Sequence, residues 1–121
     1  MKTCLIVDDS KLVRSITSKI LVDLELQTQE AENGQLALEQ CRESMPDLIL
    51  MDWHMPVMNG LECLQQLRSM PGGDGPIVVF CTSENEIDKI SQAVNAGANE
   101  FIMKPFDSEI MRSKLESVGL L

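Results

Sequence analysis

Residues 4–10 read CLIVDDS, and this stretch decides the fold. Four apolar residues in a row, two of them β-branched, are typical of a strand that is buried on both faces of a sheet. The strand then places two adjacent carboxylates, Asp8 and Asp9, at its carboxyl end. Two like charges held this close repel each other, so we expect a compensating cation beside them.

The composition is that of one compact domain. A chain of 121 residues with 44% hydrophobic residues can bury a core of its own. The net charge of -9 argues against nucleic-acid or anionic-membrane binding, because both need clustered Lys and Arg. With no apolar run of membrane-spanning length and no room for a signal peptide before the first strand, we expect a cytoplasmic protein. Four widely spaced cysteines in apolar patterns are interpreted as reduced core thiols: Cys4, Cys41, Cys63 and Cys81.

Strand-like and helix-like segments alternate along the chain. The predicted strands are Cys4–Val7, Leu26–Glu30, Leu48–Met51, Ile77–Cys81 and Glu100–Met103. Leu26–Glu30 alternates in polarity and is predicted to be an edge strand. Amphipathic stretches follow all five, with apolar residues three and four positions apart. Predicted helix starts are Ser10, Asn33, a capping box at Ser83–Glu86, and Asp107, whereas Met70–Pro76 reads as a loop.

This alternation predicts an α/β fold: a single doubly wound, five-stranded parallel sheet with five helices on its two faces. No linker divides the chain, so we expect one domain over residues 1–121.

Polar residues follow four of the predicted strands. The first strand is followed by Asp8 and Asp9, the third by Asp52, the fourth by Thr82 and Ser83, and the fifth by Lys104 and Pro105. In open parallel sheets, ligands bind at the carboxyl ends of the strands. We therefore expect these side chains to lie together at one edge of the sheet.

Three carboxylates in one place need a cation, and Mg²⁺ prefers such oxygen ligands, often together with a phosphate. Lys104 can hold a phosphoryl oxygen as a point charge, and Thr82 or Ser83 can donate a hydroxyl. This set of groups favours phosphoryl transfer, in which positioning and charge neutralisation matter most. One of the carboxylates can act as the nucleophile and form an aspartyl phosphate.

Four blocks of the sequence resemble the receiver domains of two-component response regulators: LIVDDS, MDWHMPVMNG, VFCTSE and EFIMKPF. The resemblance covers essentially the whole chain. FCTSENE, NAGANEFIMKPFD and the final VGLL are similar to single-domain chemotaxis regulators, the CheY-like proteins of alphaproteobacterial type. The resemblance implies a flavodoxin-like fold with the strand order 2-1-3-4-5, and a receiver domain without an output domain.

The resemblance also implies roles for the strand-end residues. Asp52 matches the phosphorylated aspartate. Asp9 and Asp52 match the side-chain Mg²⁺ ligands, the backbone carbonyl of His54 matches a further ligand, and Asp8 assists through water. Thr82 and Lys104 match the residues that hold the phosphoryl group.

Further positions match residues that, in the family, transmit the effect of phosphorylation or control how long the phosphoryl group is kept. Phe101 matches the switch aromatic, which responds to Thr82, and Lys104-Pro105 matches a cis peptide. Met55, Pro56 and Gly60 match the loop after the phosphorylated residue, and the positions of His54 and Glu84 tune the loss of the phosphoryl group. The imidazole of His54 either positions the attacking water or contributes nothing beyond the backbone carbonyl; both readings stay open.

The implied function is a phosphorylation-activated signalling switch. A chemotaxis-type histidine kinase would phosphorylate the protein, which would then bind an output partner such as a flagellar motor switch protein, with a phosphatase as a further partner. We expect a monomer that catalyses only its own phosphorylation and dephosphorylation and binds neither nucleic acid nor membranes. The expected partner face joins the fourth helix, fifth strand and fifth helix, with contacts from Ile87, Ile90, Phe101, Met103 and Lys114.

Other functions use a similar fold or similar chemistry. A phosphate sink or a phosphorelay intermediate in another two-component pathway would use the same chemistry and stays open. An aspartate-nucleophile phosphatase places its acid two residues after the nucleophile, a spacing that Asp8-Asp9-Ser10 and Asp52-Trp53-His54 lack. A flavodoxin-type cofactor binder requires a phosphate-binding loop rich in Gly, Ser or Thr, and Ser10-Lys11-Leu12 is not one.

Overall fold

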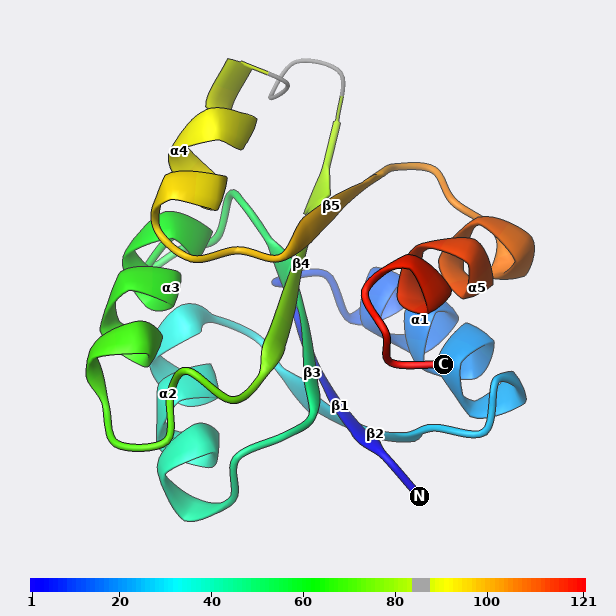
Figure 1. Cartoon of the computed structure of the whole chain (residues 1–121), viewed down its shortest axis with the longest axis horizontal. Helices are drawn as coiled ribbons and strands as arrows, with labels where there is room; N and C mark the ends of the chain where they lie inside the picture. The colour runs from blue at the N-terminus through cyan, green and yellow to red at the C-terminus, as the bar shows by residue number, and fades with distance from the viewer. Residues whose placement is uncertain (84–87) are drawn as a thin grey trace.

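A five-stranded parallel sheet runs through the centre of the computed structural model, which describes residues 1–83 and 88–121 (Figure 1). The strands are β1 (Thr3–Val7), β2 (Gln27–Ala31), β3 (Leu48–Asp52), β4 (Ile77–Thr82) and β5 (Glu100–Met103). Their order across the sheet is β2-β1-β3-β4-β5, and every neighbouring pair is parallel. The predicted doubly wound fold and strand order are confirmed.

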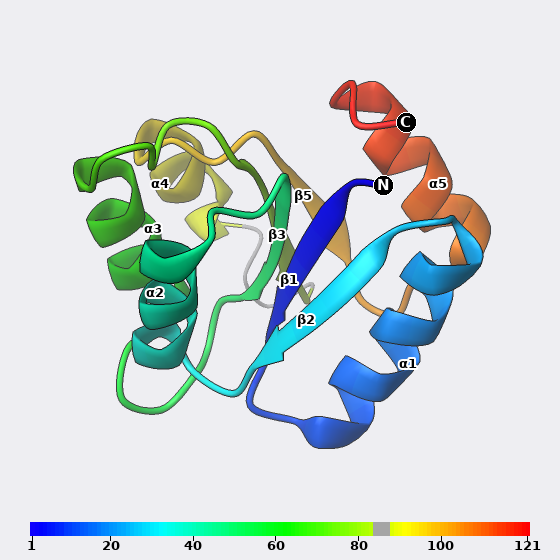
Figure 2. The same cartoon turned by 90° about the horizontal axis from the view of Figure 1, so that it is seen from below.

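The helices cover both faces of this sheet. They are α1 (Lys11–Asp23), α2 (Gly34–Glu43), α3 (Gly60–Ser69), α4 (Ile90–Asn95) and α5 (Ser108–Ser117). Figure 2 shows α2, α3 and α4 on one face of the sheet and α1 and α5 on the other. The four crossovers, through α1 to α4, therefore leave the carboxyl ends of all five strands at a common edge.

The alternation of side chains along the strands builds two cores, one on each face. Leu5, Ile49 and Phe80 face α2, α3 and α4, whereas their neighbours Ile6, Leu50 and Cys81 face α1 and α5. The three central strands are almost fully buried, as their continuous apolar runs predict. The edge strand β2 is mostly exposed.

Helix starts follow the predicted capping residues where the structure describes them. The side chains of Ser10, Asn33 and Asp107 each accept a hydrogen bond from a backbone N–H in the first turn of α1, α2 and α5. The predicted box at Ser83–Glu86 falls mainly outside the described residues. A capping box that was not predicted opens α3, where Asn59 and Glu62 exchange hydrogen bonds.

β5 has the predicted bounds, whereas the other four strands differ from theirs by one residue. β2 begins at Gln27 instead of Leu26, because the Leu26 N–H still bonds to the Leu21 carbonyl and closes α1. β3 and β4 each extend one residue further, to Asp52 and Thr82, so both polar residues belong to the strand ends. The β3–β4 and β4–β5 ladders therefore fix the backbone of Asp52 and Thr82 on two neighbouring strands.

Arg68, near the end of α3, joins the two loops that precede β4 and β5, at the amino ends of these strands. Its guanidinium donates to the carbonyls of Gly73 (2.8 Å) and Pro76 (2.9 Å) in the predicted loop before β4. It also donates to the Gly97 carbonyl from two nitrogens (3.1 and 2.8 Å) and to the Asn99 side chain (3.2 Å). One side chain therefore ties α3 to the turn between α4 and β5.

The four cysteines are free and buried, as the sequence analysis expected. Burial raises the pKa of the Cys63 and Cys81 thiols to about 12, so neither is a reactive thiolate. Among the described residues, none of the helices has the length and apolar character needed to cross a bilayer.

Candidate functional site at the carboxyl ends of the strands

Three carboxylates gather where β1 and β3 end. Asp8, Asp9 and Asp52 each offer an oxygen, and these oxygens all lie within 4.8 Å of one another. Asp8 is buried, Asp52 is partly buried and Asp9 is exposed, so the cluster is accessible to solvent on the side of Asp9. The predicted convergence of these residues is confirmed, although their separate roles remain predictions.

The ammonium of Lys104 lies between two of the acids. Its Nζ is 3.2 Å from Asp8 Oδ2 and 3.2 Å from Asp52 Oδ1. A cis peptide links Lys104 to Pro105, as the resemblance implied. Lys104, which is distant from Asp8 and Asp9 in the sequence, therefore supplies part of the positive charge that was expected beside these acids.

The backbone around Asp8 fixes its position. Its N–H donates to the Ala31 carbonyl (3.1 Å), its carboxylate accepts from the Ser10 N–H (2.9 Å), and its carbonyl accepts from Arg14 Nη1 (2.7 Å). Sequence reasoning missed Arg14, because a backbone carbonyl leaves no trace in the residue pattern.

Asp52 has a perturbed environment. Burial raises its pKa most, the nearby Asp8 charge raises it further, and Lys104 and the Trp53 N–H (3.0 Å from Oδ1) oppose this. Burial acts to lower the pKa of Lys104, but the Asp52 and Asp8 charges outweigh burial, so the pKa is raised and the side chain stays an ammonium. Asp52 is therefore a poorly solvated carboxylate held by one cation.

The loop after β3 is closely packed against this strand. The Gly60 N–H donates to the Trp53 carbonyl (2.8 Å), and a Cβ at Gly60 would lie 2.6 Å from the Asp52 carbonyl oxygen. Val57 adopts a φ of 70°, in the left-handed region that disfavours β-branched residues, and its side chain is 79% exposed. His54 is exposed in the same loop.

Thr82 lies at the end of β4 with its hydroxyl turned to the neighbouring strand. The side chain is buried, and Oγ1 donates to Met103 Sδ at 3.4 Å. The structure therefore does not pair this hydroxyl with the acids, and its contact with a phosphoryl group remains a prediction. Sequence reasoning missed the contact, because only strand register places Thr82 opposite Met103.

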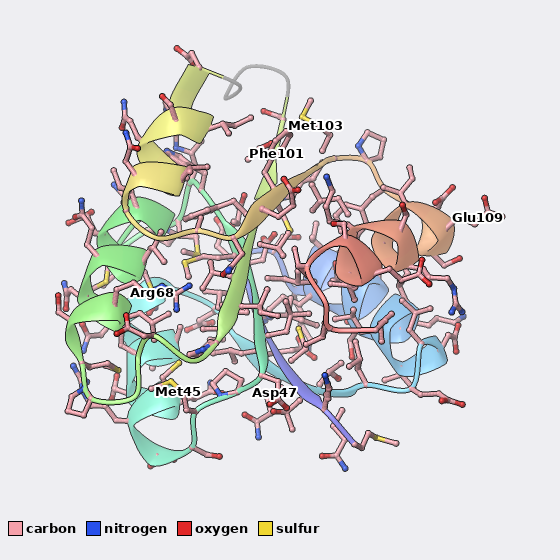
Figure 3. The ribbon with its side chains drawn as sticks, viewed as in Figure 1. Met45, Asp47, Arg68, Phe101, Met103 and Glu109 are labelled. Atoms are coloured by element: carbon pink, nitrogen blue, oxygen red, sulfur yellow. The ribbon has the colours of Figure 1, made fainter. Side chains whose placement is uncertain are left out.

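The described residues of the predicted partner face lie on β5 and on the helices α4 and α5. Figure 3 shows Phe101 and Met103 along this strand. Phe101 is partly buried, and the Lys114 ammonium lies 5.1 Å from the centre of its ring and 3.8 Å from Glu100 Oε1. Ile90 opens α4 and is partly buried. Ile87 and Glu84 lie outside the described residues.

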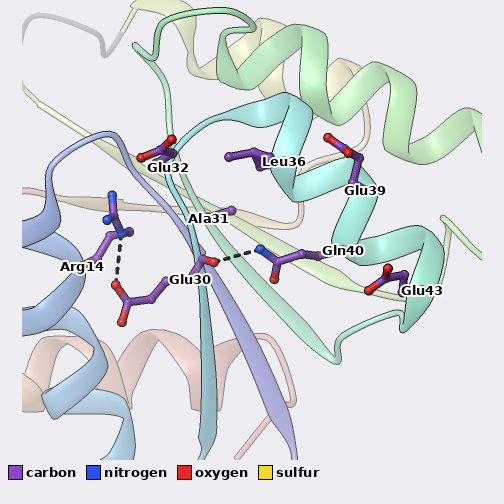
Figure 4. A pocket seen from close by; sticks show the side chains of 8 residues that line it. All are labelled: Arg14, Glu30, Ala31, Glu32, Leu36, Glu39, Gln40 and Glu43. Atoms are coloured by element: carbon purple, nitrogen blue, oxygen red, sulfur yellow. Dashed lines mark hydrogen bonds and ion pairs between the residues drawn. The ribbon is translucent and has the colours of Figure 1, made fainter.

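A second acid-rich hollow lies between α1, β2 and α2 (Figure 4). Arg14 Nε pairs with Glu30 at 3.0 Å, and the Gln40 amide donates to the Glu30 carbonyl at 2.9 Å. The same arginine supports Asp8, so this hollow adjoins the carboxylate cluster through Arg14. The remaining lining residues are Ala31, Glu32, Leu36, Glu39 and Glu43.

The sequence pattern of the response regulator receiver domain matches residues 4–116. The chain belongs to this family. The receiver fold accounts for the strand order, and membership of the family makes the protein a signalling protein rather than a conventional enzyme. The resemblance stated from the sequence is confirmed.

Single-domain relatives match this receiver domain over nearly their whole length. It is 35% identical over 117 residues to the chemotaxis protein CheY of Halobacterium salinarum, which covers 97% of this chain and 96% of that protein. CheY of Bacillus subtilis is 35% identical over 106 residues, covering 87% of each chain. Among solved structures, CheY4 of Vibrio cholerae superposes with a TM-score of 0.91 at 30% identity and covers 98% of both chains. The receiver domain is thus of the CheY-like chemotaxis type.

Proposed function

We propose that this receiver domain is a signalling switch that accepts a phosphoryl group on Asp52 from a histidine kinase. The observation that supports it best is the placement of Lys104, which lies 3.2 Å from Asp52 and from Asp8 in a cluster of three acids. A permanent cation beside a partly buried carboxylate suits the transfer of an anionic group. We take residues 1–121 as one receiver domain for this purpose.

The donor set of the cluster fits Mg²⁺. Three carboxylates contribute only hard oxygen ligands, and they outnumber the single lysine that faces them among the described residues. Asp9 and Asp52 would hold the ion by their side chains, with the His54 carbonyl as a further ligand and Asp8 acting through water. The ion would neutralise charge on the phosphoryl oxygens.

The chain's own groups then have defined tasks. A carboxylate oxygen of Asp52 forms the new P–O bond while the P–N bond to the donor imidazole breaks. Lys104 donates to a phosphoryl oxygen on Asp52, since its ammonium already lies against that carboxylate. Thr82, at the end of the next strand, supplies a hydroxyl once it turns from Met103. The protein thereby promotes its own phosphorylation and dephosphorylation.

The signal would leave through β5 and its neighbours. A phosphoryl group adds roughly two negative charges and three acceptor oxygens, which draw in the Thr82 hydroxyl. Phe101 would turn into the space behind it, and the face made by α4, β5 and α5 would change shape. Ile90, Phe101, Met103 and Lys114 are the described contacts of this face, and an output protein of the flagellar motor is the expected partner.

Trp53 offers a direct test, because it is 5% exposed and its backbone N–H donates to Asp52 Oδ1. Its fluorescence should change on adding Mg²⁺ and again on adding acetyl phosphate, with mass spectrometry showing one added phosphoryl group. Asp52→Asn should keep the fold and lose the second change, whereas Asp23→Asn at the end of α1 should behave as wild type. Phosphorylation of Asp52→Asn to the wild-type extent would contradict the proposal.

The output needs a separate experiment. Phosphorylated and unphosphorylated protein should be compared for binding to a purified flagellar motor switch protein. Binding of the phosphorylated form alone supports motor control. Equal binding of the two forms, or none, would remove motor control and favour the phosphate sink or relay. We expect both reactions in the cytoplasm, where four free thiols such as these stay reduced.

A further inference from the structure

The hydroxyl of Thr82 has one hydrogen-bond acceptor within residues 1–83 and 88–121, and that acceptor is a sulfur atom. Oγ1 donates to Met103 Sδ at 3.4 Å, and the two residues are register partners in the β4–β5 ladder. Thr82 is 1% exposed, so water does not compete freely for this hydroxyl. The contact therefore fixes the direction of the hydroxyl.

A thioether is a weak acceptor, whereas an anionic phosphoryl oxygen is a strong one. The Thr82 hydroxyl would thus leave Met103 when a phosphoryl group is present on Asp52 and return when that group is lost. Breaking the contact with sulfur costs part of what the new hydrogen bond provides.

We propose that the Met103 thioether is a positioning group that holds the Thr82 hydroxyl in the unphosphorylated state and so weakens its response to a phosphoryl group. The inference rests on the proposed function of Asp52 and Thr82. Met103 acts through Thr82 and touches neither the phosphoryl group nor the metal.

The position of Met103 also relates the hydroxyl to the partner face. Residues two apart on a strand share a face, so Met103 lies beside Phe101 on β5 (Figure 3). On β4, Thr82 is the register partner of Met103, and Phe80 is the register partner of Phe101. Release of the thioether by Thr82 therefore takes place next to the aromatic ring that the switch would move.

Met103→Leu tests this directly, because leucine has a similar volume and no hydrogen-bond acceptor. The probe is beryllofluoride, which mimics a phosphoryl group, titrated with Mg²⁺ and followed by Trp53 fluorescence. Loss of a competing weak hydrogen bond should tighten beryllofluoride binding roughly threefold. Met45→Leu, a partly buried methionine far from Met103 in Figure 3, should leave the affinity unchanged.

A double-mutant cycle separates positioning from packing. In a Thr82→Val background the hydroxyl is absent, so Met103→Leu should no longer change the affinity. In wild type, the Met103 methyl resonance should shift on adding beryllofluoride, and Thr82→Val alone should reproduce part of that shift. The methyl measurement tests the idea even if Met103→Leu folds poorly.

Equal affinity of wild type and Met103→Leu, the same gain in the Thr82→Val background, or a methyl resonance unaffected by beryllofluoride would overturn the inference. A wild-type protein that does not respond to beryllofluoride at all would overturn the proposed function as well. The two failures are therefore distinguishable.

Discussion

Replacing Arg68 by methionine should destabilise the fold strongly, although Arg68 lies far from the acids. Its guanidinium donates hydrogen bonds to the carbonyls of Gly73, Pro76 and Gly97 and to the side chain of Asn99. Methionine keeps an unbranched apolar stem and removes every donor. The change therefore isolates the hydrogen bonds from the packing of the stem.

The expected loss follows from the burial of the acceptors. The bonds to Gly73 and Pro76 are partly buried, and a hydrogen bond from a charged donor contributes about 1.5 to 3 kcal/mol in such surroundings. The bonds to Gly97 and Asn99 are exposed, so water replaces them at little cost. We expect the free energy of unfolding to fall by about 3 kcal/mol.

Urea denaturation followed by the fluorescence of buried Trp53 measures this loss. Arg68→Lys should lose nearly as much, because an ammonium cannot reach acceptors on both loops with the geometry of a planar fork. Arg42→Met, at an exposed position of α2, should change stability by less than about 0.5 kcal/mol. A loss below about 1 kcal/mol for Arg68→Met, or full stability of Arg68→Lys, would refute the reasoning.

Two further changes test the site and its loop. Val57→Asn should raise the free energy of unfolding by about 1 kcal/mol, because asparagine tolerates a φ of 70° far better than a β-branched residue; a urea titration that shows no gain would contradict the strain assigned to Val57. Lys104→Met removes the ammonium that lies 3.2 Å from Asp8 and Asp52, so Mg²⁺ should bind about tenfold more tightly. Trp53 fluorescence during a Mg²⁺ titration measures this, and weaker binding would show that Lys104 supports the metal instead of competing with it.

The sequence predicted the fold well because its signals are local. The apolar run in β1 and the helical spacing in α1 need no knowledge of distant residues. The convergence of Asp8, Asp52 and Lys104 was also predictable, since all parallel strands place their carboxyl ends at one edge.

Contacts to backbone atoms and between side-chain rotamers were not predictable. The partners of Arg68 and Arg14 are mainly carbonyls, which every residue has. The bond from Thr82 to Met103 depends on strand register and on the rotamers of both side chains. β2 is shifted by one residue because the Leu26 N–H bonds to the Leu21 carbonyl at the end of α1 and is not part of the strand.

The lysine of the carboxylate cluster is 96 residues from Asp8 and 52 residues from Asp52. No fragment that ends before β5 contains both signs of charge in this arrangement. A nascent chain on the ribosome, or one cut ahead of its last strand, would hold the acids without the ammonium that lies between two of them. The ion pairs of Lys104 with Asp8 and Asp52 therefore form only once β5 has joined the sheet.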